Sequence, residues 1–167
     1  RDIKMNKLIF SLLALSVLTM SSSVYSSAVT LENKNTETAK YFFAALEAED
    51  LEVLYSLVTE DYTWEVVGNK KLMPEAGVHG KELLTVMGSG TAFTNIVITV
   101  QDSIAQGNKV ALDVRIVADV LATGLVYDNR MVMIFRFRNG KIYSMSEHAD
   151  TATTIAATQP GRINTDF

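Results

Sequence analysis

Two side chains beside apolar runs of the sequence could do chemistry together. Glu147 ends one apolar run and Tyr62 begins another. Burial raises the pKa of a carboxyl group, which can then act as a general acid or base near neutral pH. A tyrosine hydroxyl can donate to a carbonyl or a developing oxyanion. We therefore predict Glu147 as acid/base and Tyr62 as donor. Two alternatives stay open: a structural glutamate bonded to Tyr62 or to a backbone amide, and a core tyrosine.

The histidines do not indicate a metal site. His79 and His148 are the only two, they lack the H-x-H or H-x-x-x-H spacing, and the chain has no cysteine. We therefore expect no metal and no cofactor. His79 could move a proton at the mouth of a pocket or be a solvated loop residue.

Glu147 belongs to a predicted β-hairpin over residues 127–150 that turns at Asn139-Gly140. A two-residue turn and a three-residue loop at 138–140 both fit, and the choice decides which side chains share a face. We prefer the three-residue loop, because it separates an apolar face from a polar one. The apolar face would hold Met131, Met133, Phe135, Phe137, Tyr143 and Met145, with Glu147 at its end. The polar face would hold Arg130, Arg136, Arg138, Ser144, Ser146 and His148.

Length and composition indicate one globular domain with a core. The chain has 167 residues, of which 48% are hydrophobic and 20% are charged, and its formal net charge is −4. An acidic chain without a basic stripe is not typical of nucleic-acid binding. The absence of cysteine excludes disulfides and thiolate catalysis.

The start of the chain resembles a secretory signal peptide over residues 1–28. Lys7 precedes the apolar run LIFSLLALSVLTM, and small residues follow at Ser26 and Ala28. A membrane anchor is the alternative, but the run is shorter than the roughly 20 residues that a span requires. We therefore expect cleavage after Ser26 or Ala28, export to the periplasm or the medium, no stable membrane span, and a single domain over 29–167.

Periodicity and turn residues predict the remaining elements. A polar lead-in at 29–35 precedes a helix from about Thr36 to Glu49, and Asp50 caps a second helix. Gly80 precedes a third helix, and Asp150 caps a short final one. Strands are expected at 62–67, 93–105 and 110–120, with a loop at 68–77. This order predicts an α+β domain in which helices cover a curved, mainly antiparallel sheet around an apolar pocket.

The segments DYTWEVVG, PEAGVHGKELL, YDN, FRNGKI and SEHADT occur in an order that resembles the SnoaL-like branch of the NTF2-like superfamily. That superfamily includes polyketide cyclases, ketosteroid isomerases and limonene-epoxide hydrolases. The resemblance covers roughly Thr36 to Thr158. It implies a cone-shaped fold with a deep pocket, often a homodimer through the outer sheet face, and a pocket-facing acid at Glu147.

The resemblance does not carry over the epoxide-hydrolase residues. The acid-arginine-acid set would fall on Ile116, Val114 and Glu147, and the water-holding tyrosine and asparagine on Tyr62 and Trp64. Only one acid and the tyrosine remain, so hydrolysis of an epoxide by that route is not expected. Asn129 and Tyr127 could line the pocket or hold the start of the hairpin. The expected pocket-lining residues are Trp64, Val114, Ile116, Asn129, Met131, Met133, Met145 and His79.

Two functions fit the sequence. The first is an exported protein that binds a small hydrophobic molecule and, if catalytic, performs isomerase, cyclase or dehydratase chemistry without a cofactor. The second is a non-catalytic association module, dimeric through the outer sheet face of Asp113, Arg115, Val117 and Arg136. A hollow pocket favours the first function, and a pocket filled by its own side chains favours the second.

Overall fold

A computed structural model describes residues 27–162 of the chain. All but the last two residues of the predicted signal peptide, 1–28, lie outside this range. Within residues 27–162, no helix has the length and apolar character that crossing a membrane requires.

The N-terminal helix covers residues 27–47 and packs on the sheet through Ala39, Phe42, Phe43 and Leu46. Their spacing is the apolar stripe of an amphipathic helix. The prediction of a polar lead-in at 29–35 was wrong, because polar contacts rather than apolar ones hold this part of the helix.

Those polar contacts join the N-terminal helix to the turn at Gly107. The Asn35 side chain donates to the Gly107 carbonyl at 3.2 Å. The Gly107 amide in turn donates to the Glu32 carboxylate at 2.7 Å. A search for apolar periodicity does not detect such a pair of contacts, which explains the late predicted start of the helix.

Three short helices follow: α2 at Leu51–Leu57, α3 at Glu82–Gly88 and α4 at Thr151–Thr158. Two predicted caps are confirmed. The Asp50 carboxylate accepts from the Val53 amide at 3.0 Å, and the Asp150 carboxylate accepts from the first amides of α4.

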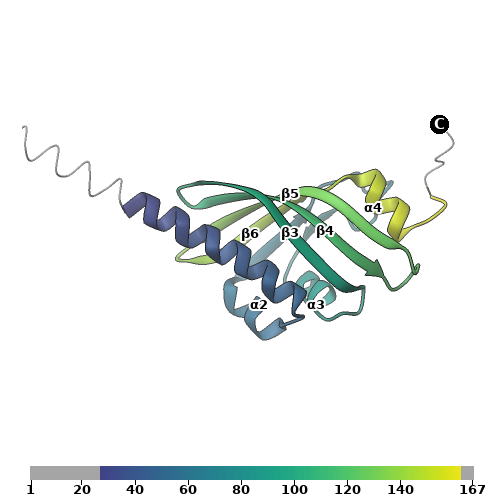
Figure 1. Ribbon diagram of the computed structural model, residues 1–167, viewed down its shortest axis with the longest axis horizontal. Helices are drawn as coiled ribbons and strands as arrows, with labels where there is room; N and C mark the ends of the chain where they lie inside the picture. Colours follow the sequence, from purple (N-terminus) through teal and green to yellow (C-terminus); the bar gives the residue numbers. More distant parts are fainter. Residues whose placement is uncertain (1–26, 163–167) are drawn as a thin grey trace, which may run out of the picture.

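Six strands form one sheet in the order β2-β1-β6-β5-β4-β3. Their bounds are β1 Val58–Val66, β2 Gly77–His79, β3 Phe93–Gln106, β4 Lys109–Val120, β5 Val126–Arg138 and β6 Lys141–His148. β1 and β6 are parallel, and the other neighbours are antiparallel. The N-terminal helix, α2 and α3 lie on one side of the curved sheet, and α4 lies at the far end from the start of the N-terminal helix (Figure 1). The predicted α+β class is confirmed.

Strand β2 was not predicted, because three residues are too few to show alternation. It pairs with β1 at one edge of the sheet, and it begins at Gly77, the last residue of the loop that we expected at 68–77.

The β5–β6 hairpin does not have the predicted three-residue loop, but Glu147 still lies on the apolar face as predicted. The turn is the two-residue type, with Arg138 opposite Lys141 and positive φ angles at Asn139 and Gly140. The register then shifts at Tyr143, so that Met133 lies opposite Glu147. One extra residue reverses which side chains share a face. The apolar face therefore includes Met145 and Glu147, as predicted.

Tyr143 itself is not on that apolar face. The Arg138 guanidinium carbon lies 5.1 Å from the centre of its ring, which places it beside the arginines. Ile142 takes the inward position next to the turn and is fully buried, opposite Phe137. Tyr143 is half-buried.

The inner face of the sheet carries the core. Phe42 and Phe43 of the N-terminal helix meet Phe135 of β5 edge to face, with ring centres 5.7 and 5.5 Å apart. Phe42 also meets Trp64 of β1 in the same manner at 6.3 Å. Edge-to-face pairs stabilise a core beyond their buried area. This aromatic cluster packs the helix against the sheet, and two of its members, Phe43 and Trp64, also line a cavity.

Candidate functional site

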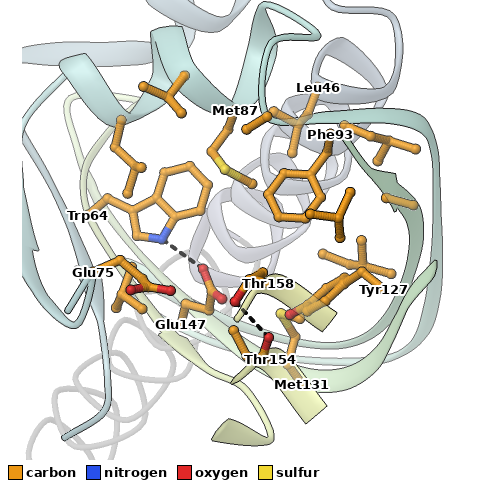
Figure 2. Close-up of a pocket in the computed structure, with 18 of the residues that line it drawn as sticks. Leu46, Trp64, Glu75, Met87, Phe93, Tyr127, Met131, Glu147, Thr154 and Thr158 are labelled. Atoms are coloured by element: carbon orange, nitrogen blue, oxygen red, sulfur yellow. Dashed lines mark hydrogen bonds between the residues drawn. The ribbon is translucent and has the colours of Figure 1, made fainter. Parts of the chain in front are cut away.

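A cavity of about 320 Å³ lies between the inner sheet face and the helices (Figure 2). Its wall is mostly apolar, with side chains from the N-terminal helix, α3, β1, β3, β4 and β5. The polar side chains in the wall are Glu75, Tyr127, Glu147, Thr154 and Thr158. This volume is at the lower end of the range for small-molecule pockets.

Glu147 projects into the cavity from β6, between Val66 of β1 and Met133 of β5. The Trp64 indole donates to its Oε2 atom at 3.1 Å. Burial raises the pKa of Glu147 above its ordinary value, and the bond from Trp64 opposes this only in part. The predicted direction is confirmed. The hydrogen-bond partner of Glu147 is Trp64, rather than Tyr62 or the backbone amide that we considered.

The second oxygen of Glu147 is open to the cavity. No donor from residues 27–162 reaches Oε1, and the side chain stays partly exposed. A carboxylic acid with one oxygen held and one oxygen free can give a proton to a bound molecule or take one from it.

Tyr127 contributes a phenolic hydroxyl group to the cavity wall. Its ring packs against Phe93 with ring centres 5.6 Å apart. Burial, and then the charge of Glu147, raise the pKa of Tyr127 to about 12, against hydrogen bonds with Thr154 and Asn129. It is therefore a protonated hydroxyl at neutral pH.

Helix α4 brings in two threonines that the sequence analysis missed. Thr154 and Thr158 are one turn apart and face the cavity (Figure 2). Their hydroxyls donate to the carbonyls of Asp150 and Thr154, at 3.0 and 2.8 Å. The four-residue spacing of the threonines was the available signal, but it is common on solvated helices as well.

Glu75 is a second carboxylate in the wall, also missed, and it comes from the loop before β2. The Gln159 side chain donates to its two oxygens at 3.0 and 3.1 Å. Loop residues follow no periodicity, so only the structure could place Glu75 in the pocket.

The predicted lining residues divide into three groups. Trp64, Ile116, Met131 and Met133 line the cavity together with Glu147. Val114 and Met145 face the same side of the sheet but are fully buried in the core. The alternation was correct for these two groups, but it does not show how deep the cavity reaches between the sheet and the helices.

Asn129 and His79 hold the backbone instead of lining the cavity. Asn129 donates to the Asp150 carbonyl and the Thr154 hydroxyl at 3.0 and 3.1 Å, and accepts from the Asp150 amide at 3.2 Å. His79 donates through Nε2 to the Glu75 carbonyl at 2.7 Å. These contacts position α4 and the Glu75 loop.

Tyr62 lies in the core, outside the cavity lining. It is 2% exposed, and no atom of the described residues hydrogen-bonds to its hydroxyl. Burial, and next the charge of Glu147, raise its pKa. Tyr127 therefore occupies the place in the wall that we predicted for Tyr62.

The fold, a curved sheet with covering helices, is that of an NTF2-like protein. The family model described as the SnoaL-like domain matches residues 39–145. The chain belongs to this family. No curated protein sequence matches the chain.

Solved structures show the same fold. An NTF2-like protein from Burkholderia xenovorans LB400 is 26% identical, with a TM-score of 0.62, over 77% of this chain and 98% of that one. The protein Bal32a from a soil-derived mobile gene cassette is 23% identical, with a TM-score of 0.64, over 77% and 98%. A Jannaschia sp. CCS1 protein, provisionally named a SnoaL-like polyketide cyclase, is 18% identical, with a TM-score of 0.62, over 76% and 92%.

Proposed function

We propose that the protein binds a small hydrophobic molecule in this cavity, with Glu147 as the polar contact. The observation that carries the proposal is a hollow, largely apolar space of about 320 Å³ with one unpaired carboxyl oxygen facing into it. A pocket that served only as core would be filled by side chains. An apolar ligand gains free energy by leaving water for such a wall.

Acid/base chemistry without a cofactor is the reaction class that suits these residues. A buried carboxyl group with a raised pKa can accept a proton from a carbon or oxygen of the ligand and return it elsewhere. Tyr127 can donate to an oxygen that gains charge during the transfer. The provisional name of the Jannaschia relative, a SnoaL-like polyketide cyclase, favours cyclase chemistry within this class.

We also propose that the protein acts outside the cytoplasm. The support is the sequence of residues 1–28, with a basic start, a short apolar run and small residues before the expected cleavage site. Mass spectrometry of the protein from cell fractions tests this. A mature chain that starts after Ser26 or Ala28 and lies in the periplasm or medium is the expected result, and an uncleaved cytoplasmic chain would contradict it.

Trp64 offers a direct binding assay, because it is the only tryptophan and lies in the cavity wall. We expect its fluorescence to change on titration with small ketones, lactones and polyketide-like aromatics. Glu147→Gln should alter affinity or turnover for any compound that binds. Glu65→Gln is the matched control, since Glu65 is on the same strand as Trp64 and is exposed on the outer face. A panel without any binder would contradict the proposal.

The alternative function, a homodimeric association module, has one observation in its favour. The outer sheet face carries exposed apolar side chains, including Val97 (56% exposed), Ile104 (71%) and Val132 (40%). Such side chains on a strand face are typical of protein contacts when they gather in a patch. Dimerisation through this face is compatible with ligand binding on the other.

A further inference from the structure

Three of the side-chain donors in the cavity wall, on Trp64, Thr154 and Thr158, are already used. The Trp64 indole donates to Glu147 Oε2 at 3.1 Å. The hydroxyls of Thr154 and Thr158 donate to backbone carbonyls at 3.0 and 2.8 Å. Each of these groups has a single donor hydrogen. A ligand that needs donors from the protein would have to break one of these bonds or turn to Tyr127.

Acceptors, in contrast, remain available. No atom of residues 27–162 donates a hydrogen bond to Glu147 Oε1. Among these residues, only the Gln159 side chain donates to the Glu75 carboxylate, at 3.0 and 3.1 Å. An ionised carboxylate has about four lone-pair sites. Both side chains line the cavity (Figure 2), so a ligand meets two carboxyl groups with unused acceptor capacity.

No cation balances these carboxyl groups. Among the described residues that line the cavity there is no lysine, arginine or histidine, and the remaining titratable group, Tyr127, is a protonated phenol. An anionic ligand would lose its hydration and meet two carboxyl groups, with no cation in the wall to balance its charge. Transferring a charge from water to a buried site is costly when no opposite charge is present. The cost is much smaller when the charge is paired in the site.

We propose that the natural ligand is a small apolar molecule that carries a protonated amine, seated on Glu147 with Glu75 nearby in the wall. This inference rests on the proposed function and names the ligand class for the same cavity. An ammonium group brings three donors and a positive charge, whereas the wall has no cation and, apart from the Tyr127 hydroxyl, its side-chain donors are occupied. The rings of Trp64, Phe93 and Tyr127 can also attract a cation held against their faces.

A change in proton binding should accompany the amine. Burial raises the pKa of the unliganded Glu147. The groups that face it are Trp64 on β1, Tyr127 on β5 and Glu75 on the loop, with Tyr62 behind the wall, and none of these is a cation. An ammonium ion would lower the Glu147 pKa by direct attraction. Below the raised pKa, binding of an ammonium ion therefore releases a proton, whereas binding of an alcohol does not.

A matched series of probes tests the inference: phenethylamine, phenethyl alcohol and phenylacetate, titrated by Trp64 fluorescence. We expect the amine to bind at least about tenfold more tightly than the alcohol, since a charge-assisted bond is about twice as strong as a neutral one. Phenylacetate should bind most weakly. Glu147→Gln should remove the preference for the amine, and Glu65→Gln, which deletes an outward carboxylate of β1, should keep it.

Calorimetry of the unaltered protein in two buffers of different ionisation enthalpy gives a second readout, with proton release expected for phenethylamine alone. Equal or tighter binding of the alcohol or phenylacetate would overturn the amine inference and leave an apolar binding pocket in place. An amine preference that survives in Glu147→Gln would overturn the seat on Glu147. If neither these probes nor the broader panel bind, both the inference and the proposed function are wrong.

Discussion

At the scale of single residues, the buried hydroxyl of Tyr62 allows a sharp prediction. It has no hydrogen-bond partner among the described residues. An unpaired buried polar group lowers stability, so its removal should raise it. We expect Tyr62→Phe to raise the free energy of unfolding by about 1 kcal/mol in denaturant titrations, and to leave ligand binding unchanged. A clear loss of stability would show that a buried water bonds to this hydroxyl.

The ionisation of Glu147 should appear in the pH dependence of stability. Burial raises its pKa above the ordinary 4.5, so the folded protein favours the neutral acid. This favourable contribution is complete below 4.5 and is lost as the pH rises through the raised pKa of the folded state. Glu147→Gln lacks this loss. We therefore expect the unfolding free energy of the variant, relative to the unaltered protein, to increase with pH across this interval.

The difference in unfolding free energy between the unaltered protein and Glu147→Gln separates the effect of Glu147 from that of the paired surface acids. Asp61 beside Arg138 has a pKa lowered to about 2, and Asp113 beside Arg130 is lowered too. Their contributions are lost as the pH falls and are the same in both proteins, so they cancel in the difference. A difference that does not change with pH would mean that Glu147 ionises in the native protein as it does in the unfolded chain.

The residue scale also shows what sequence can reveal about a site. Glu147 was predictable because it follows an alternating apolar strand, where any acid must enter apolar surroundings. Glu75 was not predictable, because the sequence of a loop does not indicate the direction in which its side chains point. The choice of Tyr62 over Tyr127 had a similar origin: both begin apolar runs, and only the three-dimensional structure shows that Tyr127 lines the cavity and Tyr62 does not.

At the scale of elements, strand faces were predictable and register was not. The inward side chains of β4 follow from its alternation, and burial confirms them from Val110 to Val120. The hairpin is different, because a two-residue turn with an extra residue at Tyr143 gives the same facing for Glu147 as a three-residue loop. The pattern determines only whether a residue faces in or out, and the same pattern fits either turn.

Helix α4 gives the prediction for this scale. Asp150 accepts from the amides of Ala152 and Thr153 at 2.9 and 3.2 Å, which caps the helix. Asp150→Ala should cost about 1 kcal/mol of unfolding free energy, whereas Asp150→Asn, a good cap, should retain most of it. Because α4 carries Thr154 and Thr158, the alanine variant should also weaken ligand binding measured by Trp64 fluorescence. Equal stability of both variants would contradict the capping role.

At the scale of the whole molecule, the sheet has two faces with different chemistry. The inner face is covered by helices and encloses the cavity. On the outer face, Arg130 pairs with Asp113 and Arg115 with Asp128, each through two hydrogen bonds. Arg115 and Arg130 lie directly opposite each other on β4 and β5, so the two acids also relieve their repulsion. The exposed Val132 lies on β5, and the exposed Val97 lies on β3, the edge strand next to β4.

If two copies associate through this face, a twofold axis brings each substituted position into the interface twice. Val97→Glu would then place a carboxylate from each copy in an apolar contact, and we expect the dissociation constant to rise by at least about tenfold. Sedimentation equilibrium measures this. Tyr41→Glu is the matched control, because Tyr41 is 54% exposed on the N-terminal helix, which covers the inner face of the sheet. A dimer that Val97→Glu leaves intact would show that the two copies meet elsewhere, and the ion pairs of β4 and β5 would then serve only to hold the strands together.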